Sequence, residues 1–194
     1  MNIVEEIHVV KNSPRFYGMS LFGAIAISLG ANAQTHKLPK TDAEHIANAM
    51  SAAPPAISHD ATVMAMDGDK MRTIRQGKNE FTCVSDDPSS PGNDPMCLDK
   101  NAMEWLMALS DHKDAPKGKM GLVYMLQGGS DASNYDPFAT APKPGEKWVT
   151  TGPHVMVVGM AGMLEDLPKS PDNPKKPFIM WSGTSYEHIM MPVK

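Results

Sequence analysis

Residues 120–127 read MGLVYMLQ and form a continuous apolar run of the length of one β-strand. A strand that is apolar on both faces is typical of the centre of a sheet that is covered on both sides. Gly128 and Gly129 end the run abruptly, since glycine permits tight turns that other residues disfavour. We therefore expect a sheet built around residues 120–127, with further protein packed on each of its faces.

The segments on both sides of this run predict more strands and two helices. Strand-like patterns occupy residues 61–66, 71–75, 81–84, 154–158, 178–181 and 186–193. Helices are predicted over residues 42–52 and 99–111. The second has Met103, Leu106 and Met107 on its predicted buried face and Trp105 to one side. Together these segments predict one α+β domain over residues 34–194, with a mainly antiparallel sheet of about six or seven strands and two principal helices.

The N-terminal segment has the pattern of an export signal. Lys11 and Arg15 precede the apolar run MSLFGAIAISL at residues 19–29, and Ala-Asn-Ala follows at residues 31–33. A signal peptidase recognises this small-x-small pattern, so residues 1–33 are predicted to be a cleaved signal peptide. The run is shorter than the ~20 residues of a membrane-spanning helix. The expected location is periplasmic or secreted, with no stable membrane anchor after cleavage; an uncleaved anchor is the alternative.

Two cysteines, Cys83 and Cys97, lie in the predicted mature part. An exported protein meets an oxidising compartment, so we predict a Cys83–Cys97 disulfide that closes a loop rich in proline and glycine. The alternative is a metal site with two thiolates. Zinc would then need two more nitrogen or sulfur ligands, and no histidine or further cysteine lies between or just beside these two.

Composition narrows the classes of partner. The chain of 194 residues has a net charge of −4, and its lysines and arginines are scattered rather than clustered. Binding to a phosphate backbone needs a basic face, so nucleic acid is not an expected partner. The 17 methionines are unusually many. The sequence does not indicate a protein partner.

Two matching tripeptides, His154-Val155-Met156 and His188-Ile189-Met190, lie on predicted strands. Side chains at positions i and i+2 of a strand point to the same face, so each tripeptide would present one imidazole and one thioether together. If the two strands are neighbours, His154, Met156, His188 and Met190 could converge on one metal ion. These ligands suit Cu(I), and copper is the possible cofactor. The alternative is chance, because methionine is also a common filler of cores.

A long segment predicted to be irregular, residues 128–152, follows the central run. Segments of this length are usually functional or mobile. Its first part, Gly128–Asp136, is rich in glycine and polar residues. We predict that it binds a small ligand or a metal ion, with the contacts made by Ser130, Asp131, Asn134 and Asp136. The alternative is a turn whose polar side chains bond to their own backbone.

These features favour an exported protein that binds a metal ion or a small molecule. One alternative is a hydrolase-like enzyme that uses the Gly128–Asp136 loop with His154 and His188, although the Gly-x-Ser-x-Gly motif is absent and no catalytic residue is assigned. Another is an interaction module without a small-molecule site. The three tryptophans are interpreted as core residues rather than as a stacking platform.

Several longer stretches carry a resemblance to other proteins. They are PGNDPMC at residues 91–97, LQGGSDASNYDPFATAP at 126–142, GPHVM at 152–156 and MWSGTSYEHIMMPV at 180–193. With these stretches, most of residues 41–194 resembles small exported bacterial proteins described only as hypothetical. The resemblance implies export and a single domain. It transfers no catalytic residue, because no activity is established for that group.

Overall fold

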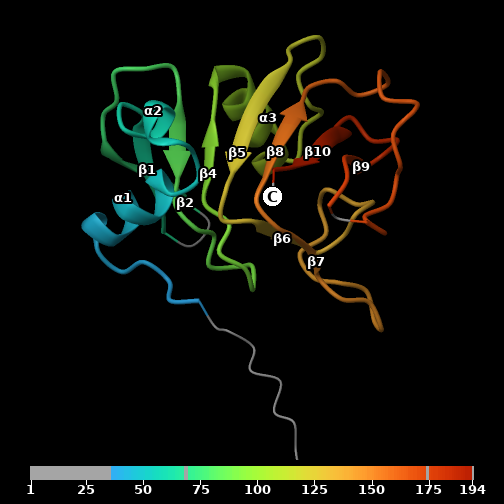
Figure 1. Ribbon diagram of the computed structural model, residues 1–194, viewed down its shortest axis with the longest axis horizontal. Helices are drawn as coiled ribbons and strands as arrows, with labels where there is room; N and C mark the ends of the chain where they lie inside the picture. Colours follow the sequence, from blue (N-terminus) through green and yellow to red (C-terminus); the bar gives the residue numbers. More distant parts are fainter. Residues whose placement is uncertain (1–35, 68–69, 174, 194) are drawn as a thin grey trace, which may run out of the picture. The chain divides into compact units, whose positions relative to one another are not determined.

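The strand predicted from MGLVYMLQ lies inside an eight-stranded sheet. The computed structural model describes residues 36–67, 70–173 and 175–193. The sheet has the order β2-β1-β3-β4-β5-β8-β10-β9 (Figure 1). Its strands are β1 (Thr62–Asp67), β2 (Lys70–Arg75), β3 (Thr82–Val84), β4 (Met96–Leu98), β5 (Gly121–Met125), β8 (His154–Val158), β9 (Phe178–Met180) and β10 (His188–Pro192). The predicted α+β class with a mainly antiparallel sheet is confirmed, because only β1 and β3 pair in parallel.

A second, two-stranded sheet was not predicted. It pairs β6 (Gly129–Asp131) with β7 (Val149–Thr151), inside the segment that the sequence predicted to be irregular. β6 follows β5 after a turn at Gly128, whose φ of 100° lies in the region that favours glycine. The turn fixes where the polar loop leaves the main sheet.

Three helices accompany the sheets: α1 (Asp42–Met50), α2 (Pro55–Ser58) and α3 (Lys100–Ser110). Thr41 caps α1 in a capping box with Glu44, and Asp99 caps α3 by accepting from the backbone N–H of Ala102. The predicted positions of α1 and α3 are confirmed within two residues. The four-residue helix α2 comes in addition to the two principal helices.

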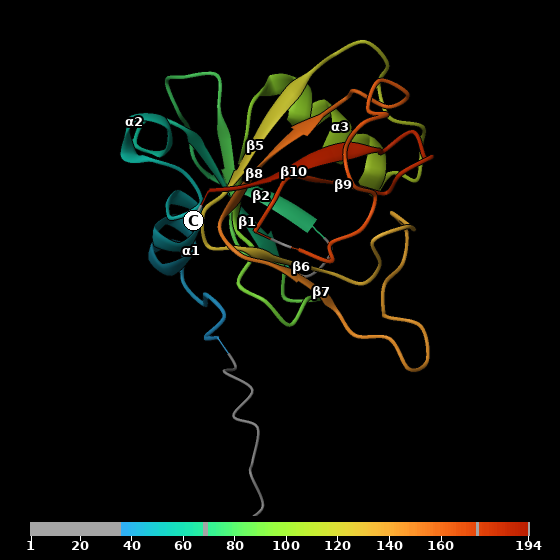
Figure 2. The same cartoon turned by 45° about the vertical axis from the view of Figure 1, so that its right-hand side comes forward.

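The helices cover opposite faces of the main sheet. α1 and α2 pack near β1, β3 and β4, whereas α3 packs on β4 and β5 (Figures 1 and 2). On the α3 side a large core contains Leu98, Val123, Met156, Trp105 and Trp181. The central strand β5 is buried on the face of Gly121, Val123 and Met125, whereas Leu122 and Tyr124 on the other face are only half-buried, so the expected burial of both faces is met only in part.

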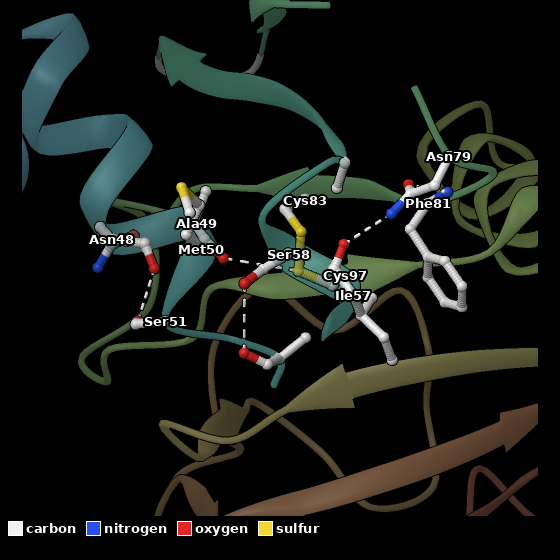
Figure 3. Close-up of a disulfide and its surroundings, with 12 residues drawn as sticks. Asn48, Ala49, Met50, Ser51, Ile57, Ser58, Asn79, Phe81, Cys83 and Cys97 are labelled. Carbon is white, nitrogen blue, oxygen red and sulfur yellow. Dashed lines mark hydrogen bonds between the residues drawn. A yellow bond between two sulfur atoms is a disulfide. The ribbon is translucent and has the colours of Figure 1, made fainter. Parts of the chain in front are cut away.

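The α1 side of the sheet holds the predicted disulfide, which is confirmed. Cys83 and Cys97 are register partners on β3 and β4, and both are fully buried. Figure 3 shows the bridge beside α1, where the sulfur of Cys97 lies 3.6 Å from the carbonyl oxygen of Ala49. The bridge joins two strands of only three residues each, so it adds a covalent link where the hydrogen-bond ladder is short.

The predicted buried face of α3 is correct for Met103 and Leu106, which pack against the core, but wrong for Met107 and Trp105. Trp105 is 4% exposed and Ala102 is fully buried, whereas Met107 is 42% exposed. The prediction followed the long aliphatic side chains, but the large indole of Trp105 is the group that faces the sheet. Trp105 is therefore available to line the space between α3 and the strands.

The predicted signal peptide, residues 1–33, lies outside the described residues, which belong to one compact unit, Gln34–Lys194. Among the residues that the structure describes, no helix has the length and apolar character needed to cross a membrane.

Candidate functional site

A cavity of about 340 Å³ lies on the α3 side of the sheet. Main-sheet strands β4, β5, β8 and β10 form its floor, and α3, the small sheet and the loop after β6 form its walls. Its volume is at the small end of the range for pockets that bind small molecules. Figure 2 shows β8 and β10 side by side, as their antiparallel pairing requires, with the small sheet next to them.

His154, at the start of β8, lines this cavity with a fixed orientation. Its ring Nδ1 lies 2.7 Å from the carbonyl oxygen of Gly152, and its side chain is almost completely buried. Since a carbonyl only accepts hydrogen bonds, Nδ1 carries the proton and Nε2 presents a lone pair. Nε2 is buried and has no hydrogen-bond partner among the described residues. Burial lowers the pKa of His154, so the ring is neutral at pH 7.

His188, at the start of β10, repeats this arrangement. Its Nδ1 donates to the carbonyl oxygen of Tyr186 at 2.9 Å, and its Nε2 is also buried without a partner in the described chain. Burial lowers the pKa of His188 to about 4. The ring contacts Trp105 and Trp181 edge to face, with centroid distances of 5.5 and 5.0 Å. The cavity therefore has two neutral imidazole acceptors.

The sheet register relates the two histidines. β8 and β10 are neighbours, and Met156 lies directly opposite Met190. The register places His154 opposite Pro192 and His188 at the level of Val158, so the histidines are four residues apart along the strands. At ~3.3 Å per residue this offset is roughly 13 Å, although all of these side chains share one face. Each imidazole therefore has a different methionine as its closest neighbour.

Each histidine has a methionine as its partner on the next strand. Met125 of β5 is the register partner of His154, and Met180 of β9 is the register partner of His188. Directly opposed side chains have Cβ atoms about 5 Å apart. Met125 and Met156 line the cavity with His154, whereas Met190 is buried in the core and does not line it.

Acidic side chains form the opposite wall. Asp94, from the disulfide loop, accepts hydrogen bonds from the Ser90 hydroxyl and from the backbone N–H of Ser130. Burial, together with the neighbouring Asp86, raises the pKa of Asp94 to about 7. Burial and the charge of Asp94 raise the pKa of Asp131 to about 7 as well. Both carboxyl groups are thus partly protonated at neutral pH.

The polar loop is held against the cavity by Trp181. The backbone N–H of Trp181 donates to the carbonyl of Asn134 at 2.8 Å, and its Nε1 donates to the carbonyl of Ser133 at 2.9 Å. These bonds hold Trp181 at a φ of 54°, which is uncommon for a bulky residue. In this conformation its indole stacks on Trp105, with the ring centroids 5.9 Å apart.

Three of the four loop residues predicted to bind a ligand line the cavity: Ser130, Asp131 and Asp136. Asn134 does not; its side-chain amide donates to the carbonyl of Lys169 at 3.2 Å. Together with His154, Met156 and His188, six of the eight predicted site residues line this cavity. The register nevertheless keeps His154 and His188 apart and leaves Met190 outside the lining, so the expected convergence of the four His and Met side chains on one ion is not observed.

The hydrolase alternative requires a serine bonded to a histidine. The Ser133 hydroxyl instead accepts from the backbone N–H groups of Tyr135 and Asp136, as in a turn. Both imidazoles use Nδ1 for a backbone carbonyl, and both Nε2 atoms lack a partner in the described chain. In this state neither histidine activates a serine.

Several lining residues were missed by the sequence reasoning, namely Asp94, Met125, Trp105, Trp148 and Trp181. Trp105 and Trp181 are core residues, as predicted, yet they also face the cavity. The sequence signal that could have indicated a pocket was the presence of three tryptophans in a chain poor in aromatic residues.

Comparisons with protein-family models, with curated proteins and with solved structures gave no match. Within the described residues, no group of three or more His, Cys, Asp or Glu side chains is arranged to hold a metal ion.

Proposed function

We propose that the protein binds a small ligand in the cavity between the polar loop and strands β8 and β10. The observation that carries this proposal is the pair of buried Nε2 atoms of His154 and His188, which line one cavity without a partner in the described chain. An unpaired buried polar atom costs about 1–3 kcal/mol, so two such atoms in one cavity favour an occupant that bonds to them.

Export to the periplasm or the medium is part of this proposal. The buried Cys83–Cys97 disulfide supports it, because such bonds persist in oxidising compartments. The export pattern at residues 1–33 supports it as well.

The test is a thermal-shift screen of small molecules and metal ions on the purified protein. At a ligand concentration of 100 times Kd, binding adds about 2.7 kcal/mol of stability, or roughly 5–10 °C in Tm for a domain of this size. The shift should disappear in the double variant His154→Gln/His188→Gln and persist in His59→Gln, whose side chain is exposed and outside the cavity. If every hit shifts the double variant equally, the cavity is not the binding site.

Cu(I) is a second candidate, favoured by the pairing of His154 with Met125. Together with Met156 at i+2, this pairing places two thioethers on the face of the imidazole. Both types of ligand suit Cu(I), and an imidazole that donates Nδ1–H to a carbonyl is the usual state of a metal-binding histidine. The ion would lie at the His154 end of the cavity.

Competition against a Cu(I) chelator under anaerobic conditions tests this candidate. Met125→Leu removes a thioether at nearly constant volume and should weaken Cu(I) binding, whereas Met163→Leu, at a methionine that is 71% exposed, should leave it unchanged. Equal affinities in the two variants would remove His154–Met125 as the copper site.

A further inference from the structure

The charged side chains that line the cavity are acidic. Four carboxyl groups line it, those of Asp87, Asp94, Asp131 and Asp136, and its described lining includes no lysine or arginine. Both histidines are held neutral by burial. The field inside the cavity is therefore negative, and an anionic occupant would be repelled.

The four carboxyl groups form a path from the surface to the interior. Asp136 is exposed and Asp87 is partly exposed, whereas Asp94 is 6% exposed. Asp87 also lines a neighbouring groove of about 680 Å³, which shares Pro137 and Thr140 with the cavity and gives a ligand a way in. A cation would thus meet acidic groups both at the mouth and inside.

Either imidazole of the lining, unpartnered at Nε2 within the described chain, can accept an N–H of an amine. The Nε2 atoms of His154 and His188 are acceptors, and each side chain is only 1% exposed. Indole faces attract cations, and Trp105, Trp148 and Trp181 all line the cavity. Trp105 Nε1 is a buried donor without a partner in the described chain, so it suits one acceptor atom on the ligand.

We propose that the occupant is a small organic cation, an amine with an aromatic or apolar body and one oxygen acceptor, recognised by the Asp94 and Asp131 carboxyl groups, by one of the two imidazoles and by the indoles. This inference rests on the proposed binding function and names the ligand class of the same cavity. The ammonium group supplies the positive charge that lets both carboxyl groups ionise, and the ring lies against the indoles. Because Asp94 is tied to Ser90 and Ser130, it fixes the position of the charge.

Three probes with the same 4-hydroxyphenyl body and terminal groups of different charge test the class: tyramine as the cation, tyrosol as the neutral alcohol and phloretate as the anion. Calorimetric titration of the full protein at neutral pH and low salt should show tyramine binding about tenfold or more tighter than tyrosol, and no binding of phloretate. Asp131→Asn should weaken tyramine binding about fivefold or more. Asp166→Asn makes the same charge change at an exposed residue outside the cavity and should have no effect.

The inference is overturned if tyrosol or phloretate binds as tightly as tyramine, if tyramine shows no binding at low-millimolar concentration, or if Asp166→Asn and Asp131→Asn weaken it equally. The binding function is judged separately by the thermal-shift screen. A neutral or anionic hit that is lost in His154→Gln/His188→Gln would keep the binding function and remove only the cationic class. A screen without any hit would remove both.

Discussion

Acidification should destabilise the protein through His188, by an amount that follows from its environment. Burial lowers the pKa of His188 from its ordinary value of 6.5 to about 4. Between pH 6.5 and pH 4 the unfolded chain therefore binds more protons at this residue than the folded protein does, so stability falls as the pH falls. The difference between the two pKa values corresponds to a loss of about 3 kcal/mol by pH 4.

Two carboxyl groups oppose this effect, so the wild-type profile alone does not isolate it. The pKa values of Asp94 and Asp131 are raised to about 7, and both groups take up protons in the folded state as the pH falls from 7 to 4. They therefore favour folding over the same window. Comparison with His188→Gln removes their contribution, because both proteins retain these carboxyl groups.

The assay is urea denaturation, followed by tryptophan fluorescence from pH 4 to pH 8. Between pH 7 and pH 4 the wild type should lose about 3 kcal/mol more than His188→Gln. His59→Gln, at an exposed histidine, should follow the wild type. A constant difference between wild type and His188→Gln across this range would refute the assignment of His188 as a neutral buried imidazole.

Three further outcomes follow from the structure. Reduction of the Cys83–Cys97 disulfide, whose cysteines are 14 residues apart, should cost about 3 kcal/mol and lower Tm by roughly 6–12 °C in calorimetry; an unchanged Tm with both thiols free would contradict this. Asp131→Asn should raise the free energy of unfolding by up to about 4 kcal/mol at pH 8 and by less than about 1 kcal/mol at pH 4, because burial and the charge of Asp94 penalise only the ionised carboxyl; an equal gain at both pH values would argue against it. Gly121→Ala should destabilise by about 2–3 kcal/mol in urea, since its Cβ would lie 2.4 Å from the backbone nitrogen of Ala102, whereas Gly152→Ala meets no atom within 4 Å and serves as the control.

The sequence predicted most of the main sheet because its strands carry strong local patterns. The apolar run at β5 and the strand at β8 were placed within one or two residues, and the disulfide followed from the presence of only two cysteines. The small sheet was missed because β6 and β7 are short, polar and separated by a loop. Their pairing depends on tertiary contacts, and the local sequence pattern does not predict such contacts.

Site residues that lie close together in the sequence were predicted. Site residues that are brought together by the pairing of distant strands were missed. The i, i+2 rule correctly placed His154 and Met156 on one face, and likewise His188 and Met190. Met125 was missed because its position opposite His154 is set by the pairing of β5 with β8. Asp94 likewise reaches the loop after β5 only because the disulfide loop folds across the sheet.

The cavity lining is poorly suited to stability alone, and this is the strongest physical argument for a ligand. Two neutral imidazoles present acceptors that have no partner in the described part of the chain, and the pKa values of two carboxyl groups are raised because their ionised forms are penalised. A packed apolar core at these positions would be more stable. Asp131→Asn separates the effect on stability from the effect on binding, because it should stabilise the folded protein while weakening the binding of a cation. A residue that lowers stability in the empty cavity and raises affinity in the filled one is best explained by selection for binding.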